Sequence, residues 1–303
     1  MNDKTRRLLG NPYDTDDLSD GRWIKTNFHT HAGTGEGCGA TPMDVALQQY
    51  RGLNYGALCI SNHDRYTDTT SLGDEKLYMI QGVEYSPYPH MLTIGVDRSL
   101  HDLPHQAAID ETARAGGFTI LCHPNWQYKG YWPPEKLDAL TGYVGMEVMN
   151  SLIYRLSGSG RATDVWDNVL RQGKLTWGFG SDDFHTPSDA GRGYTDIYIK
   201  SPGFEGIKQA VAAGRLTAST GLSLDYLRMA DGVIQVKAKF PTETYVDTFY
   251  YRFVTENGVA AESQGWSAEY RIQNENYIRV ETIAENGAML FTQPIYRKEF
   301  FGT

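Results

Sequence analysis

Histidines and carboxylates stand in this sequence at spacings that could bind metal ions. His29-Thr-His31 and Asp183-Phe-His185 each place two potential ligands at positions i and i+2. On an extended chain such side chains point to the same side, so both can reach one ion. Imidazole and carboxylate ligands without thiolate suit Mn, Fe or Zn and disfavour Ca, which prefers oxygen ligands alone. Either pair alone is weak evidence for a metal site.

The distribution of histidines is stronger evidence. Six of the eight histidines lie beside the boundary of an expected strand: His29, His31, His63, His90, His123 and His185. Asp183 is preferred over Asp182 as a ligand because only Asp183 keeps the D-x-H spacing to His185. His101 and His105 have a helical metal-binding spacing, but Pro104 lies between them, and we interpret them as surface or capping residues. The sequence therefore predicts one metal site built from strand ends.

Short apolar segments alternate with helical patterns over the first 220 residues, which is typical of βα units. We expect strands over residues 23–28, 55–61, 77–83, 91–96, 118–122, 143–149, 175–180 and 196–200. We expect helices over residues 41–51, 106–115, 164–171 and 205–213. The carboxyl ends of parallel barrel strands converge on one face, which would bring the scattered ligands together.

The pattern changes at about residue 222. Period-2 or aromatic-rich strands are expected over 233–240, 248–254, 277–283 and 288–292, with no helical pattern between them. Glu256-Asn-Gly258 and Glu285-Asn-Gly287 have the composition of hairpin turns. We therefore predict two domains, an α/β domain over residues 1–221 and a small all-β, immunoglobulin-like sandwich over residues 222–303.

Composition excludes several classes of protein. The 303 residues carry a net charge of −9, which argues against binding to the negatively charged backbone of duplex DNA. No apolar run approaches the ~20 residues that a helix needs to cross a bilayer. Three cysteines without repeated spacing indicate a reducing compartment, and the N-terminal residues lack a signal-peptide pattern. We expect a cytoplasmic protein that acts on a small molecule and could form a homo-oligomer.

Five motifs occur in an order that resembles one known family. They are His29-Thr-His31, Ser61-Asn-His63-Asp64, Gly82-Val-Glu84, His123-Pro124 and Gly180-Ser-Asp-Asp183-Phe-His185. The sequence resembles the PHP (polymerase and histidinol phosphatase) family of metal-dependent phosphoesterases over about residues 23–200. The resemblance implies a distorted, TIM-like (β/α)7 barrel that binds two or three divalent ions at the carboxyl ends of its strands.

Carried over position by position, the resemblance implies a set of metal ligands. They are His29, His31, Glu36, His63, Glu84, His90, His123, Asp183 and His185. Glu84 would bridge two ions, and His90 matches an extra histidine of trinuclear members. Two positions depart from the family pattern: Glu36 stands where an aspartate is usual, and Asn62 replaces the aspartate before His63.

The function implied is hydrolysis of a small phosphate ester by a hydroxide that bridges two metal ions, since bound metals lower the pKa of water. Glu84 and Asp183 would contact these ions, and Asp183 or His123 would move the proton. Arg155, Arg161 and Arg192 follow strands whose ends face the site, and each is either a phosphate-binding fork or a solvated loop residue.

Two alternatives stay open. A barrel followed by a β-sandwich is also similar to the subgroup that contains carbaryl-hydrolysing esterases, which implies hydrolysis of carboxyl or carbamate esters. The third interpretation is a barrel that binds metal without catalysis. The near-complete ligand set argues against this interpretation, because decayed sites tend to lose ligands one by one.

Overall fold

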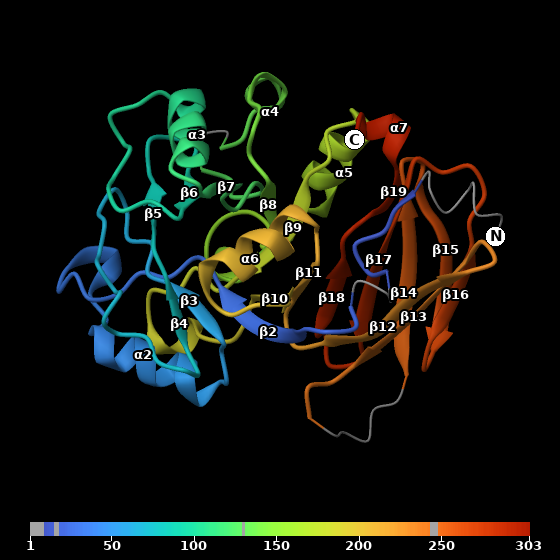
Figure 1. Ribbon diagram of the computed structural model, residues 1–303, viewed down its shortest axis with the longest axis horizontal. Helices are drawn as coiled ribbons and strands as arrows, with labels where there is room; N and C mark the ends of the chain where they lie inside the picture. Colours follow the sequence, from blue (N-terminus) through green and yellow to red (C-terminus); the bar gives the residue numbers. More distant parts are fainter. Residues whose placement is uncertain (1–8, 15–17, 129–130, 243–247) are drawn as a thin grey trace.

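The computed structural model describes residues 9–14, 18–128, 131–242 and 248–303. An α/β part contains every helix from α2 to α6, and a strand-rich part lies at the other end of the molecule (Figure 1). The helices of the α/β part are α2 (Met43–Gly52), α3 (His105–Arg114), α4 (Pro134–Ala139), α5 (Thr163–Arg171) and α6 (Gly203–Ala212). Within the described residues, no helix is both long and apolar enough to span a membrane.

Ten strands of the α/β part fall into two sheets. One contains β2 (Arg22–Asn27), β3 (Ala57–Cys59), β4 (Tyr78–Ile80), β10 (Tyr194–Ile199) and β11 (Leu216–Ser219), in the order β11-β10-β2-β3-β4. The other follows chain order through β5 (Gly82–Tyr85), β6 (Met91–Ile94), β7 (Phe118–Leu121), β8 (Gly145–Asn150) and β9 (Trp177–Ser181). The class is mixed α/β as expected, but a closed (β/α)7 barrel is not evident, because the two sheets are separate and contain antiparallel pairs.

The two sheets enclose an apolar core. Strands β3, β5, β6, β7 and β9 are buried along their whole length, and most of their residues are apolar on both faces instead of alternating, with Glu84 of β5 as the charged exception. Phe28, Ile120 and Phe179 meet in this core, where Phe28 lies 5.8 Å from Phe179 between ring centroids. This packing fixes the strand ends from which the polar side chains project.

The strand-rich part contains two sheets around a second core. The elements are β12 (Ser223–Ala230), β13 (Val233–Lys239), β14 (Phe249–Thr255), β15 (Gly258–Gly265), β16 (Ala268–Arg271), β17 (Tyr277–Ala284), β18 (Met289–Thr292), β19 (Ile295–Arg297) and α7 (Lys298–Phe301). Strands β12, β13 and β16 form one sheet, and β14, β15, β17 and β18 belong to the other. Leu227, Val236 and Phe253 are among the buried residues of the shared core.

The second of these sheets continues into the α/β part. Strand β18 pairs with β11, so a single eleven-stranded sheet runs through both parts, and β19 pairs with β1 (Leu9–Gly10). A buried ion pair adds to this connection: the guanidinium of Arg279 in β17 donates two hydrogen bonds of 2.7 and 2.8 Å to Asp167 in α5. The strand-rich part is thus hydrogen-bonded to the part that carries the histidines.

Candidate metal centre

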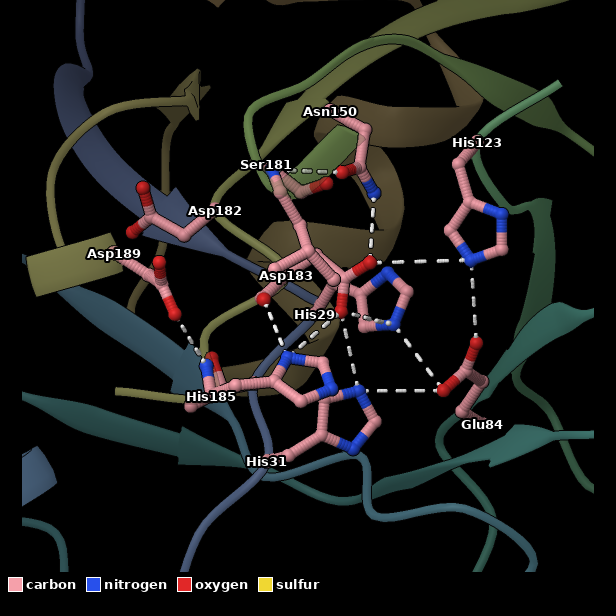
Figure 2. Close-up of polar contacts among 12 residues, drawn as sticks. His29, His31, Glu84, His123, Asn150, Ser181, Asp182, Asp183, His185 and Asp189 are labelled. Atoms are coloured by element: carbon pink, nitrogen blue, oxygen red, sulfur yellow. Dashed lines mark hydrogen bonds and ion pairs between the residues drawn. The ribbon is translucent and has the colours of Figure 1, made fainter. Parts of the chain in front are cut away.

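Strand ends bring the predicted ligands to one place (Figure 2). His29 and His31 follow β2, His123 follows β7, and Asp183 and His185 follow β9. Glu84 lies within β5, and a single bridge pairs it with His63 after β3. His29, His31, Glu84 and Asp183 are buried. Residues separated by more than 150 positions in the sequence therefore meet in one cluster.

Four of these residues form a compact set of donor atoms. The Nε2 atoms of His29 and His31 each lie 3.3 Å from Glu84 Oε2 and 3.3 Å from Asp183 Oδ1. An ion about 2.1 Å from four tetrahedral donors holds those donors about 3.4 Å apart. The donors present therefore fit a small divalent cation.

Glu84 lies between this set and other histidines. Its Oε2 is 2.8 Å from His63 Nδ1, and its Oε1 is 2.9 Å from His90 Nδ1 and 3.5 Å from His123 Nε2. His31, His63 and His185 form a further group whose donor atoms lie within 4.8 Å of one another. The two oxygens of one carboxylate thus face different groups of imidazoles, as a carboxylate bridging two ions must.

The four donor atoms of the compact set have no hydrogen-bond partner in the protein: His29 Nε2, His31 Nε2, Glu84 Oε2 and Asp183 Oδ1. Buried polar atoms nearly always have a hydrogen bond, so four buried donor atoms without one, at 3.3 Å across the set, favour a bound cation. A bound cation would satisfy all four at once. This observation is independent of the sequence motifs.

The electrostatics of the cluster also favour a cation. Burial alone raises the pKa of Glu84, but His63, His29 and His90 outweigh it and hold that pKa well below its usual range. Burial lowers the pKa of His29, whereas Asp183, Glu84 and Glu147 raise it well above its ordinary value. Carboxylates held ionised inside the protein attract positive charge, which a proton or a metal ion can supply.

Two of the predicted ligands adopt strained backbone conformations. His123 has φ = 29° and Asp183 has φ = 51°, in the left-handed region that non-glycine residues seldom occupy. Such conformations cost ~1–3 kcal/mol and are typical of functional sites. Asp182, next to Asp183, points away from the histidines: its carboxylate accepts hydrogen bonds from the backbone N–H groups of Gly191, Arg192 and Gly193.

Sequence reasoning missed Glu147, which orients two of the histidines. Its Oε1 accepts a 2.8 Å hydrogen bond from His29 Nδ1, and its Oε2 accepts a 2.7 Å bond from the backbone N–H of His123. Asn150 Nδ2 donates to Glu147 Oε2 at 2.8 Å and to Asp183 Oδ2 at 3.1 Å. A single glutamate within the otherwise apolar segment 143–149 was the signal that could have identified it.

Sequence reasoning also missed Cys38. Its thiol is hydrogen-bonded to His185 and His63, and these contacts lower the pKa of Cys38 to about 5. Glu36 is exposed and lines a neighbouring hollow with His31, His63 and Cys38. Among the described residues, the groups of clustered donor atoms do not include Glu36. Cys38 therefore contributes a thiol beside His63 and His185.

The three arginines lie in different surroundings. Arg155 lines a cavity beside the cluster, where its Nη2 is 3.0 Å from Asp189 Oδ2. Arg161 instead pairs with Glu281 of β17. Arg192 has an exposed side chain and is not among the residues that line this cavity. The structure thus brings one of the three arginines to the candidate centre.

Solved structures provide a comparison for this arrangement. A two-domain protein from Bacteroides vulgatus, described as containing a predicted PHP-like metal-dependent phosphoesterase, matches with a TM-score of 0.56 over 91% of this chain and 96% of its own. The two sequences are 14% identical. This chain has a PHP-like fold. The PHP-like fold confirms the fold family that the five motifs indicate.

The remaining comparisons add little. The lesion-specific endonuclease PfuEndoQ from Pyrococcus furiosus superposes with a TM-score of 0.45 and 10% identity over 63% of this chain and 56% of its own, which is too low to support an argument. No protein-family profile and no curated protein matches the sequence. The PHP-like fold and the geometry of the centre are therefore the basis for assigning a function.

Proposed function

We propose that this chain is a member of the PHP family and a metal-dependent hydrolase of phosphate esters. The observation that carries the proposal is the set of four unpartnered, buried donor atoms from His29, His31, Glu84 and Asp183. The PHP-like fold supports it. The separate sheets would correspond to a distorted, open form of the expected (β/α)7 barrel, over residues 1–221.

The proposed metal ligands are those that the strand ends bring together: His29, His31, His63, Glu84, His90, His123, Asp183 and His185. Two or three ions of Mn, Fe or Zn match this number and type of donors. Divalent ions bound there would lower the pKa of water and polarise a phosphoryl oxygen.

The chain itself would hold the substrate and move the proton. With Asp183 Oδ1 among the metal donors, its Oδ2, 3.9 Å from His123 Nε2, is left to accept a proton from the attacking water and pass it to the leaving oxygen, and His123 would take this role only through a nitrogen that does not bind metal. The Arg155 guanidinium, at the wall of the adjoining cavity, can donate hydrogen bonds to a phosphate oxygen.

A specific observation favours a second candidate, hydrolysis of carboxyl or carbamate esters. Only Arg155 among the three predicted arginines lines the cavity, and its charge is partly compensated by Asp189. A neutral ester needs no further cation. This reaction would use the same ligands and the same proton acceptors.

A reconstitution experiment separates the two candidates. Protein stripped of metal is loaded with Mn, Fe or Zn, its metal content is measured by elemental analysis, and hydrolysis of 4-nitrophenyl phosphate, bis(4-nitrophenyl) phosphate and 4-nitrophenyl acetate is followed. We expect at least two ions per chain and turnover of a phosphate ester that chelator and Asp183→Asn abolish. Loaded protein that cleaves only the acetate would replace the phosphoesterase by the second candidate.

A further inference from the structure

A cavity of about 500 Å³ opens beside the candidate metal centre. Its lining joins Glu84, His123 and Asp183 to a set of apolar side chains. These apolar side chains are Tyr88, Trp126, Leu152, Ile153 and Leu156. Cavities of this size and composition bind organic molecules of tens of atoms, which is far more than a phosphate group fills.

The aromatic part of the lining is held in place. The ring of Trp126 stacks on Tyr128 with centroids 5.0 Å apart and 16° between the planes, and Tyr128 lies 5.6 Å from Tyr88. The backbone of Trp126 is fixed by a bridge to Gly158 and by a 3.0 Å hydrogen bond to His123 O. A flat apolar surface therefore stands next to a predicted metal ligand.

The charge of the lining is low outside the metal centre. Apart from the predicted ligands and Cys38, Arg155 is the charged lining residue in the described part of the chain, and Asp189 lies 3.0 Å from it. Tyr88 and Leu156 line the cavity although 45% and 42% of their surfaces are exposed to water. A ligand that covers these surfaces gains apolar contact, whereas a second charged group on it would find no partner.

We propose that this cavity binds a flat, uncharged aromatic group, which in a substrate is the alcohol part of the ester. The assignment to an ester rests on the proposed function, but the binding of the aromatic group does not. Hydrolysis would break the bond between phosphorus and the aryl oxygen, join the water oxygen to phosphorus and transfer a water proton to the departing alcohol. The neutral aromatic alcohol is then a product that the cavity retains.

Binding of 2-naphthol to metal-stripped protein tests the proposal by calorimetry. We expect saturable binding of 2-naphthol and none of glycerol, and a loss of affinity of at least about tenfold in Trp126→Ala. Trp266→Ala is the matched control, because Trp266 is a 59% exposed tryptophan of the strand-rich part. Leu156→Ser, a change at an exposed position, should weaken binding without affecting the fold.

Equal affinity in the parent, Trp126→Ala and Leu156→Ser, or no saturable binding at all, would overturn the proposal. With metal-loaded protein, we expect kcat/KM for 2-naphthyl phosphate to exceed that for glycerol phosphate by about tenfold or more, and Trp126→Ala to remove the preference. Naphthol binding without ester hydrolysis would reject the proposed function and leave the aromatic site standing. Hydrolysis of both esters at equal kcat/KM would reject the aromatic site alone.

Discussion

Glu84 and Glu147 are both buried carboxylates of the α/β part, yet their surroundings give them different tasks. Glu84 faces imidazole nitrogens, and its Oε2 has no hydrogen-bond partner. Both oxygens of Glu147 accept hydrogen bonds, from Ser181, Asn150 and the two histidine segments. Glu84 is thus available to a metal ion, whereas Glu147 orients the imidazole of His29 through its other nitrogen.

Replacing Glu147 should weaken metal binding without removing a ligand. In Glu147→Gln the charge that holds the His29 Nδ1–H is lost, and we expect metal affinity to fall by ~10–100-fold. Metal affinity is measured by competition with a chromophoric chelator. Glu135→Gln, on an exposed turn of α4, is the control and should leave it unchanged. An unchanged affinity in Glu147→Gln would show that the hydrogen bond has no part in orienting the ligand.

Replacing Arg155 should lower activity on negatively charged phosphate esters and leave activity on neutral esters unchanged. For Arg155→Ala we expect kcat/KM on the best phosphate ester to fall by about 30- to 1000-fold, equivalent to ~2–4 kcal/mol of charged hydrogen bonding. Activity on a neutral aryl acetate should hardly change. Arg192→Ala is the control, since Arg192 is exposed and lies outside the cavity lining. If both variants keep full phosphoesterase activity, the phosphate does not bind at Arg155.

At the scale of elements, the loop 157–161 links the strand-rich part to the cavity. Arg161 pairs with Glu281 of β17, while the backbone of Gly158 bridges to Trp126. For Arg161→Ala we expect KM for an aryl ester to rise about 5- to 30-fold, because a charged hydrogen bond that holds the loop is lost, with metal content unchanged. Arg228→Ala, an exposed position of β12, is the comparison. A loss of metal in Arg161→Ala would contradict this division of roles.

Strands β2 and β10 place a buried carboxyl opposite a lysine, since Asp196 and Lys25 are paired in register. Burial raises the pKa of Asp196 to about 7, although Lys25 and Ser223 oppose the shift. The folded protein therefore keeps a proton that the unfolded chain releases above pH ~4, so stability falls as the pH rises from ~4 to ~7. The predicted decline is at most ~4 kcal/mol.

Asp196→Asn should remove that decline. The decline of stability with pH is measured by thermal unfolding of metal-free protein at several pH values between 4 and 8. The control is Asp44→Asn, because Asp44 is an exposed carboxylate of α2. The expected result is a flatter dependence of Tm on pH in Asp196→Asn alone. Parallel curves for all three proteins would mean that Asp196 is ionised in the folded state throughout this range.

For the whole molecule, the sequence could predict local features better than long-range pairing. The metal-ligand motifs and helices such as α5 depend on neighbouring residues, and the structure has them close to the expected positions. The pairing of β18 with β11 joins residues 71 to 75 positions apart, such as Leu290 with Ser219 and Phe291 with Ala218, and no local pattern encodes it. Glu147 and Cys38 were missed for the same reason, because their partners come from distant strand ends.

The continuous sheet predicts that the α/β part and the strand-rich part unfold together. In denaturant, far-ultraviolet circular dichroism and tryptophan fluorescence should report a single, coincident transition. Asp167→Asn weakens the pair with Arg279, which keeps Glu281 as a second partner, and should lower the free energy of unfolding by about 1.5–3 kcal/mol while keeping one transition. Arg252→Ala, which breaks an exposed pair with Glu262, should change it by less than about 1 kcal/mol. Two separate transitions in the parent protein would contradict the prediction.

The pairing of β18 with β11 and of β19 with β1 also sets an order of events on the ribosome. The last proposed metal ligand, His185, is translated 107 residues before Thr292, the end of β18. At ~5–20 residues per second this interval lasts roughly 5–20 s. From its own synthesis at Leu216–Ser219 until β18 follows, β11 is an unpaired edge in the nascent chain, a position prone to aggregation. A metal ion that arrives in this interval meets all of its donors before the final strands complete the sheet.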